Sequence, residues 1–188
     1  LLPADIDNDG DIDFIAGKLG LNTQFKTNEQ EPLITYAADF DNNGKIDPIM
    51  TWYVQHVSYP FNTRDEITGQ LPVLNNKFLR YENYAKATID QLFTEEQLSK
   101  ARKYYVYHTE SALLINNGGR FTLKALPAEA QFSAVKGILY KDYDGDGHKD
   151  ILLTGNFYPF RVQQGRCDAS IGTLLKGDGK GNFSVVDR

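Results

Sequence analysis

The sequence of 188 residues has one cysteine, Cys167, and it lacks the patterns typical of disulfide-bonded, membrane-spanning and nucleic-acid-binding proteins. A single cysteine excludes a disulfide within the chain, and we expect Cys167 to be a small, partly buried side chain. No apolar run approaches the roughly 20 residues of a membrane-spanning helix. No basic stripe indicates nucleic-acid binding, and no nucleophile–base pair or phosphate-binding loop indicates catalysis. We therefore predict no membrane span, no nucleic-acid partner and no catalytic residue.

What the chain does contain is aromatic and acidic residues in an uneven distribution. Aromatic residues make up 12% of it, and 16 glycines and 7 prolines accompany them. This composition favours a strand-rich fold over a helical bundle. The formal net charge is −5, and twelve aspartates lie in only three windows of nine residues. Outside these windows the chain has 18 lysines and arginines against 13 aspartates and glutamates, so the whole negative excess lies in the windows and needs a local explanation.

The three acidic windows are copies of one motif. Asp5–Asp13, Asp39–Asp47 and Asp142–Asp150 read DIDNDGDID, DFDNNGKID and DYDGDGHKD. Strand-like runs precede the second and third windows, at Leu33–Ala38 and Val135–Tyr140. Short apolar stretches follow all three windows, at Phe14–Ala16, Pro48–Thr51 and Ile151–Thr154. Each copy therefore predicts a strand, an acidic loop and a second strand.

The motif has the chemistry of a calcium loop. Ca²⁺ takes roughly six to eight oxygen ligands, and a tight loop can supply them from positions 1, 3, 5 and 9 and from the carbonyl of position 7. Position 6 is glycine in every copy, where the chain must reverse. The expected ligands are Asp5, Asp7, Asp9, Asp11 and Asp13; Asp39, Asp41, Asn43, Lys45 and Asp47; and Asp142, Asp144, Asp146, His148 and Asp150. We expect up to three Ca²⁺ ions, because Mg²⁺ dehydrates reluctantly and requires stricter geometry.

An EF-hand is the nearest alternative for such a loop. It requires a bidentate glutamate at position 12 and a helix on either side. Position 12 is Ala16, Met50 and Leu153 in the three copies, each within an expected strand. The sequence therefore excludes the EF-hand.

Two further segments predict hairpins, and one region predicts helices. Ala112–Leu126 and Thr173–Val186 are apolar runs interrupted by Gly/Asn/Asp turns. Between the second and third acidic windows, Thr63–Glu66 and Thr94–Gln97 match helix capping boxes. The runs Tyr84–Phe93 and Glu95–Tyr105 have helical periodicity. We predict a mostly helical insertion over residues 62–107, whose simplest role is to cover a sheet edge.

These motifs resemble a known repeat. The acidic pattern running into FIAG or LLTG, with the NNGGRF and GDGKGNF hairpins, resembles the FG-GAP/VCBS repeats of integrin-α-like β-propellers. Ala16–Asn22 and Gly155–Ser170 resemble the bacterial branch associated with ASPIC/UnbV domains. The resemblance implies a mainly β fold: a partial β-propeller of about three blades, with residues 1–188 forming one segment of a longer protein. It also implies an extracytoplasmic location and packing against the remainder of the propeller.

Strand alternation suggests where a ligand would bind. A strand that leaves an acidic loop ends on the opposite side of its sheet, so Lys18–Pro32, Gln55–Tyr107 and Asn156–Ser170 should gather opposite the loops. Aromatic, charged and amide groups there suit a protein or glycan ligand, although the tyrosines would also suit simple packing. The candidate ligand residues are Tyr53, His56, Tyr59, Arg64, Asp65, Tyr158, Arg161, Arg166 and Asp168.

Two functions remain open from the sequence. The first is a non-catalytic, calcium-stabilised module of an exported protein that binds protein or carbohydrate. The alternative is part of a secreted carbohydrate-active enzyme, a lyase or hydrolase, in which calcium is structural. An enzyme would need a titratable pair, for which His56, Arg64, Asp65 and Asp168 are the candidates.

Overall fold

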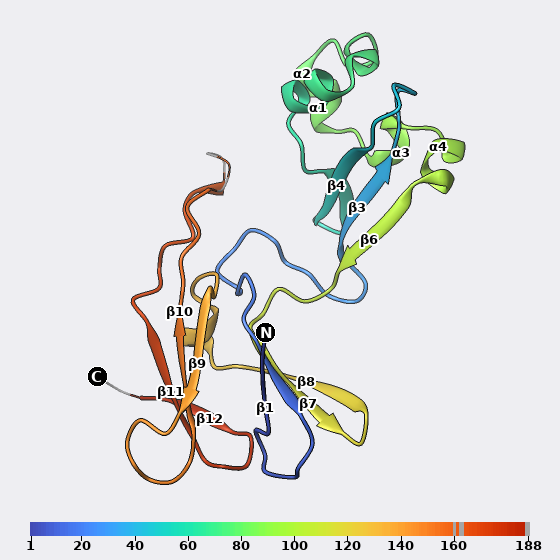
Figure 1. Ribbon diagram of the computed structural model, residues 1–188. Coiled ribbons are helices and arrows are strands. Elements are labelled where there is room, and N and C mark those ends of the chain that lie inside the picture. The colour runs from blue at the N-terminus through green and yellow to red at the C-terminus, as the bar shows by residue number, and fades with distance from the viewer. Residues whose placement is uncertain (160, 162–163, 187–188) are drawn as a thin grey trace. The chain divides into compact units, whose positions relative to one another are not determined.

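The computed structural model describes residues 1–159, 161 and 164–186, and the chain divides into two compact units. Unit 1 combines Leu1–Gln24 with Thr109–Arg188, and unit 2 is the continuous segment Phe25–His108. The described residues form a mainly β structure with three antiparallel sheets of four strands (Figure 1). None of the described helices is long and apolar enough to cross a membrane.

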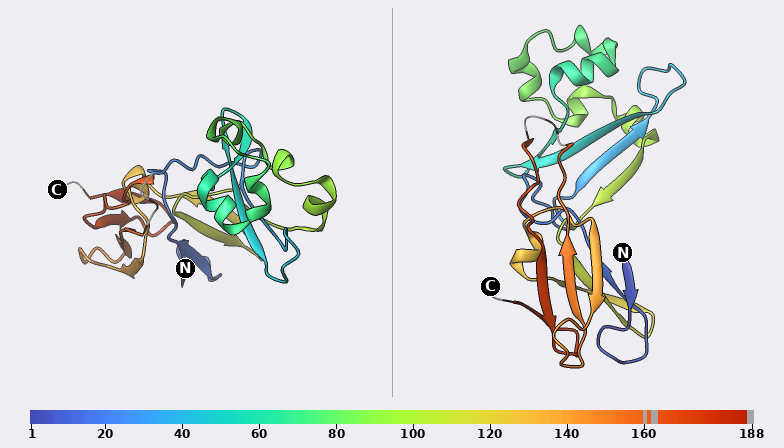
Figure 2. Two further views of the ribbon diagram at one scale, coloured as in Figure 1. Left: turned by 90° about the horizontal axis from the view of Figure 1, so that it is seen from above. Right: turned by 60° about the vertical axis from the view of Figure 1, so that its left-hand side comes forward.

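Unit 1 contains two sheets with the same internal order, β1-β2-β7-β8 and β9-β10-β11-β12 (Figure 2). The first consists of β1 (Leu2–Ala4), β2 (Asp13–Ala16), β7 (Ala112–Asn117) and β8 (Arg120–Ala125). The second consists of β9 (Gly137–Lys141), β10 (Asp150–Thr154), β11 (Thr173–Gly177) and β12 (Phe183–Val185), and the short 3-10 helix η2 (Ala128–Gln131) precedes it. In each sheet an acidic loop joins the first two strands and a predicted hairpin forms the last two, so both hairpin predictions are confirmed.

The two sheets of unit 1 share one hydrophobic core. Ile15 and Leu113 come from the first sheet, and Ile151, Leu153 and Leu175 come from the second; all five are almost fully buried. Neighbouring strands therefore present their apolar faces to a common interior, as period-two patterning requires.

Unit 2 holds the third sheet and all the α-helices of the described chain. Its elements are β3 (Leu33–Ala38), β4 (Asp47–Val54), β5 (Val57–Pro60), α1 (Arg64–Gln70), η1 (Pro72–Asn75), α2 (Tyr81–Ala85), α3 (Ile89–Leu92), α4 (Glu95–Lys100) and β6 (Arg102–Val106). The sheet order is β5-β4-β3-β6. The fourth strand thus lies beside the strand that enters the acidic loop, whereas in unit 1 it lies at the other edge.

The helical region agrees in part with the sequence. Both predicted capping boxes form, and Thr88 provides a third that the sequence analysis missed. The helix expected over Glu95–Tyr105 is wrong beyond Lys100, because Arg102–Val106 pairs with β3 as a strand. The helix expected over Tyr84–Phe93 is interrupted, since α2 ends at Ala85 and the extended backbone of Thr88 precedes the start of α3.

The position of the helices differs from the expectation that they lie opposite the acidic loop. Phe40, within that loop, stacks on Phe93 with ring centroids 3.9 Å apart, and Gln97 Nε2 donates to the Phe40 carbonyl at 3.1 Å. The helices therefore lie beside the loop. The reason is the tight β4–β5 hairpin, whose turn at Gln55 and His56 brings the chain back toward the loop before α1 begins.

In unit 1 the expectation for the irregular segments holds. Leu21 donates its N–H to the Gln131 carbonyl at 3.0 Å, and Asn22 donates to the Phe132 carbonyl at 3.1 Å. From the other segment, the buried Cys167 accepts at its carbonyl from the Ser133 hydroxyl at 2.7 Å. Residues 18–24 and 156–170 thus meet across residues 131–133, although residues 160, 162 and 163 lie outside the described part.

The sheets do not follow one another along the chain. Unit 2 enters between β2 and β7, two neighbouring strands of the first sheet. The insertion expected over residues 62–107 lies inside this larger one, which begins at Phe25 and carries an acidic loop of its own.

Replacing residues 25–108 by a short Gly/Ser linker should leave unit 1 folded. The Gly20 N–H already donates to the Thr109 carbonyl at 2.8 Å, so the two ends to be joined lie close together. We expect a cooperative thermal transition and dispersed amide NMR signals from this variant, and the same from residues 25–108 alone, which contain their own core. A random-coil spectrum from either piece would contradict the division.

Candidate metal centres

The three acidic loops share one backbone shape. Position 4 has a left-handed backbone in each loop, with φ of 62° at Asn8, 59° at Asn42 and 79° at Gly145. The glycine at position 6 follows with φ of 95°, 84° and 90° at Gly10, Gly44 and Gly147. The N–H of position 7 donates to the side chain at position 5, at 2.8, 2.9 and 2.8 Å for Asp11–Asp9, Lys45–Asn43 and His148–Asp146. These local bonds fix a chain reversal that turns the carboxylates inward.

The aspartate at position 9 is buried in all three loops. Asp13, Asp47 and Asp150 are 0%, 5% and 2% exposed. One oxygen of each accepts the N–H of position 2 in its own loop, at 2.8, 3.1 and 2.9 Å for Ile6, Phe40 and Tyr143. This hydrogen bond joins positions 2 and 9 across the loop and closes it without a metal ion.

The second oxygen of position 9 ties the loop to a neighbouring element. Asp13 accepts the Asn116 N–H of β7 at 2.7 Å, and Asp150 accepts the Gly177 N–H of β11 at 3.0 Å. In unit 2 the Gln70 amide, at the end of α1, lies 3.4 Å from Asp47. Because both oxygens are engaged in hydrogen bonds, each buried carboxylate is compensated and acts as a structural clip.

Each loop gathers three carboxylates tightly enough to share one ion. One oxygen from each member of a triad lies within 4.8 Å of the others. The triads are Asp5, Asp7 and Asp13; Asp39, Asp41 and Asp47; and Asp142, Asp144 and Asp146. Positions 1 and 3 therefore belong to every triad, position 9 to the first two and position 5 to the third.

The first loop leaves carboxylate oxygens without compensation. Asp5 Oδ1 and Asp7 Oδ1 are buried and have no hydrogen-bond partner in the described part of the chain. Burial, followed by the neighbouring charges of Asp9 and Asp13, raises the pKa of Asp7 above its ordinary value. Buried polar atoms of this kind call for an ion or a water molecule. The loop thus fits a bound cation.

The second loop compensates its charge from within. The Asn43 side-chain amide donates to Asp41 at 3.0 Å, while its main-chain N–H donates to Asp39 at 3.0 Å. Gly44 donates to the other oxygen of Asp39 at 2.7 Å. An amide at position 5 therefore replaces the repulsion of a third carboxylate with a hydrogen bond.

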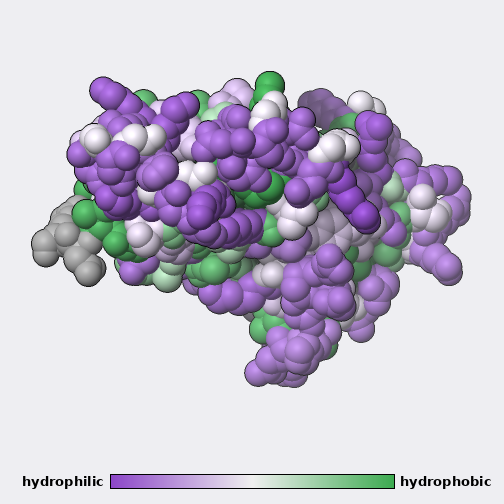
Figure 3. Space-filling view, turned by 90° about the horizontal axis from the view of Figure 1, so that it is seen from below, coloured by the Kyte–Doolittle hydropathy of each residue, from purple (hydrophilic) through white to green (hydrophobic). Residues whose placement is uncertain are grey.

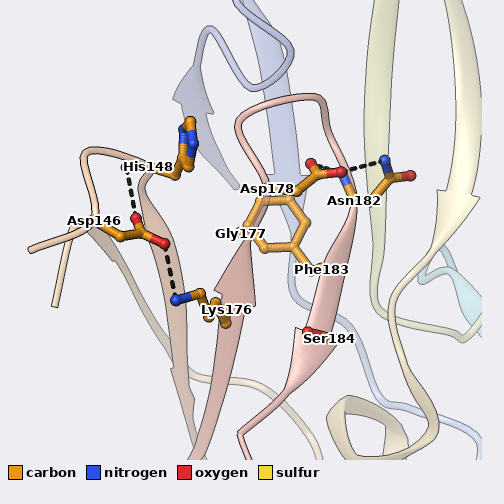
Figure 4. A pocket seen from close by; sticks show the side chains of 8 residues that line it. All are labelled: Asp146, His148, Lys176, Gly177, Asp178, Asn182, Phe183 and Ser184. Carbon is orange, nitrogen blue, oxygen red and sulfur yellow. Dashed lines mark hydrogen bonds and ion pairs between the residues drawn. The ribbon is translucent and has the colours of Figure 1, made fainter. Parts of the chain in front are cut away.

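The third loop is compensated by a lysine from another strand. Lys176 on β11 donates to Asp144. It also donates to Asp146 at 2.8 Å, the contact that Figure 4 shows. The hydrogen bond from Lys176 is the main cause that lowers the pKa of Asp146, and the same pair of carboxylates raises the pKa of Lys176. An open cleft of about 470 Å³ lies beside this ion pair, lined in part by His148, Asp178 and Phe183.

In unit 1 both acidic loops lie at the same end as the two hairpin turns (Figure 1). Asn8 of the first loop donates to the Gly179 carbonyl of the β11–β12 turn at 2.8 Å, and the His148 ring packs against the same glycine. The face drawn in Figure 3 is largely hydrophilic, with apolar residues scattered over it. The loops of unit 1 thus form one polar end connected through a single turn.

The candidate ligand residues of unit 2 are mostly engaged in its fold. Arg64 Nε donates to the Phe78 carbonyl at 2.6 Å, and Asp65 accepts from the Tyr81 hydroxyl at 2.9 Å. His56, in the hairpin turn, has its Nδ1 2.6 Å from Glu31. Tyr53 and Tyr59 lie on β4 and β5, and both are partly buried.

The remaining candidates lie on unit 1, in the segment after β10. Tyr158, Arg166 and Asp168 are exposed and Arg161 is partly buried. Arg166 and Cys167 line a small hollow together with Asn22, so the two irregular segments of unit 1 do share a surface. That these four residues form one ligand-binding face with those of unit 2 stays a prediction.

Two contacts at the acidic loops had no signal in the sequence. Gln70 and Lys176 lie 23 and 32 residues from the aspartates they contact. Neither belongs to the repeated motif, and only the pairing of strands and helices brings them to the loops. Lys176 directly precedes Gly177, whose N–H donates to the aspartate at position 9. A lysine at this position of the third strand is therefore the pattern that would reveal the same contact in a related sheet.

Searches against protein-family models, curated proteins and solved structures found no match to this chain.

The structure predicts opposite behaviour for two aspartates of the first loop. Asp13→Asn leaves one buried N–H without an acceptor, so it should lower the free energy of unfolding by about 1–3 kcal/mol with or without metal. Asp7→Asn removes an uncompensated charge, so it should be neutral or stabilising in a chelator and lose stability only in calcium. Urea unfolding in EDTA and in CaCl₂ measures both.

The two variants are controls for each other, because each changes one carboxylate of the same loop to an amide and removes one charge. Equal destabilisation of both in EDTA would show that Asp7 is also a structural clip.

Proposed function

We propose that this chain is a non-catalytic calcium-binding module of an exported protein, which presents a rigid surface to a protein or carbohydrate ligand. The observation that carries the proposal is the threefold repetition of one loop shape, each time with three carboxylates within 4.8 Å. Surface turns do not need such a concentration of charge, since it raises their repulsion without any gain in packing. A bound divalent cation removes that repulsion.

Calcium is the ion that this donor set suits best. The triads contain only carboxylates, and the second loop adds the side-chain amide of Asn43. Such hard oxygen donors favour Ca²⁺ or Mg²⁺ over Zn²⁺ or copper. Ca²⁺ accepts irregular arrangements of roughly six to eight oxygens, whereas Mg²⁺ requires near-octahedral geometry and loses its water reluctantly. An oxygen-rich loop of this kind therefore favours Ca²⁺.

Several features support a β-propeller as the architecture. The two sheets of unit 1 repeat the order strand, acidic loop, strand, hairpin, and their apolar faces share a core. Radial repetition of such sheets is how propellers bury their faces. Unit 2 departs from the pattern, because β6 takes the edge beside β3. We therefore assign the propeller blades to unit 1 and regard unit 2 as an elaborated insertion. We also propose an extracytoplasmic location, which would provide the calcium that weakly binding loops need.

A groove on unit 2 is the surface best suited to a ligand. It has a volume of about 430 Å³, and Trp52, Val54, Val57 and Tyr59 line it from the β4–β5 hairpin. Trp52 and Tyr59 are direct cross-strand partners. An aromatic pair of this kind suits a sugar ring or an apolar peptide side chain. The enzyme alternative has less support, because His56, Arg64 and Asp65 each have a structural partner.

Calcium should raise the stability of the chain. At roughly tenfold excess over the dissociation constant, each site adds about 1.4 kcal/mol, or roughly 4 kcal/mol for three sites. Thermal melting in CaCl₂ and in EDTA measures the effect, with MgCl₂ at the same concentration as the control. Equal melting temperatures in calcium and chelator would refute the proposal.

A change at position 5 of the second loop should tighten calcium binding. Asn43→Asp removes the amide that compensates Asp41 and adds one charge. The attraction of that charge for a divalent ion about 4 Å away is about 2 kcal/mol in water, or roughly thirtyfold in affinity. Calorimetric titration measures the affinity, and Asn42→Asp is the control because it adds the same charge at position 4, which is not an expected ligand position. A similar gain from both variants would show that net charge, not position 5, controls the site.

A further inference from the structure

The two sheets of unit 1 can be aligned by a shared hydrogen bond. Asp13 accepts the N–H of Asn116, and Asp150 accepts the N–H of Gly177. In both cases the donor lies on the third strand of the sheet. The residues directly before these donors, Ile115 on β7 and Lys176 on β11, therefore occupy equivalent positions.

The two equivalent residues differ in chemistry. Ile115 packs against the core of unit 1 and offers no charge to the first loop. Lys176 reaches two carboxylates of the third loop, at positions 3 and 5. Both carboxylates belong to the triad that would hold the metal. The first loop, by contrast, keeps two buried oxygens without a partner.

We propose that Lys176 is a tethered cation that competes with the metal ion for the third loop and sets its affinity below that of the first. This inference rests on the proposed calcium binding and names how one of its sites is tuned. The ammonium group and a divalent cation require the carboxylates of the same two residues, Asp144 and Asp146. Only one of them can occupy the triad fully.

The surroundings of Lys176 permit the exchange. Its side chain is 44% exposed, and the open cleft beside it provides space for the ammonium group to withdraw (Figure 4). The lysine stays protonated when it leaves, so metal binding here releases no proton from it. The withdrawn charge still repels a divalent ion a few ångströms away, which weakens binding further.

Replacing the lysine by its counterpart in the first sheet tests the proposal. Lys176→Ile should tighten calcium binding at the third loop by roughly threefold to tenfold, the range expected for an ion pair at a partly exposed site. The glycine amides at position 6, Gly10, Gly44 and Gly147, give one NMR signal per loop. A CaCl₂ titration followed on these signals reports each site separately in the full chain.

Two matched variants separate the tethered cation from other effects. Lys176→Arg keeps the charge and should show no gain at Gly147. Lys136→Ile removes the same charge just before β9, at the end of that sheet away from the loop, and should also leave the Gly147 affinity unchanged. The reciprocal change Ile115→Lys should weaken the first loop alone, provided that circular dichroism shows the variant to be folded.

The outcomes distinguish this inference from the proposed function. Calcium binding at all three loops with no change in Lys176→Ile, or an equal gain in Lys136→Ile, would overturn the tethered-cation proposal and leave calcium binding intact. Absence of calcium-dependent shifts at all three glycines in the unmodified chain would overturn the proposed function itself, and this inference with it. A selective gain at Gly147 supports both.

Discussion

The buried carboxylate at position 9 is the interaction on which the loops depend. In all three loops one of its oxygens accepts the N–H of position 2. The other oxygen accepts from a neighbouring element, a strand N–H in unit 1 and the Gln70 side chain in unit 2. A charge in such a position is stable only because both oxygens have partners. Since the clip involves no metal, the other carboxylates are brought together by the fold itself, and a cation would meet a preorganised site.

The same backbone handles its negative charge in three ways. The first loop leaves two oxygens uncompensated, the second uses the amide of Asn43, and the third uses the ammonium group of Lys176. Loop sequence alone would rank the first and third loops as equals, because both carry aspartate at positions 1, 3, 5 and 9. The neighbouring strand breaks that equality, so the electrostatics of each site belong to its sheet and not only to its loop.

Much of the fold could be predicted from the sequence because its determinants are local. Strands around the acidic loops, the two hairpins and the capping boxes all depend on residues a few positions apart. The errors concern long-range pairing. Arg102–Val106 is a strand only because β3 offers it an edge, and the helices of unit 2 lie beside their loop only because a two-residue turn reverses the chain. Gln70 and Lys176 were missed for the same reason: their partners are set by topology, which spacing does not encode.

The insertion between β2 and β7 has a consequence for the order of folding. Ile15 pairs with Leu113, so closing the first sheet from an unfolded chain would fix the ends of a loop of about 100 residues. Unit 2 removes most of that entropy loss if it folds first, since the pairing of Leu33 with Val106 brings its own ends together. The intervening chain then behaves as a short tether, and the rate-limiting closure becomes one of a few tens of residues. Folding of unit 2 before the first sheet closes is thus the route with the smaller loss of chain entropy.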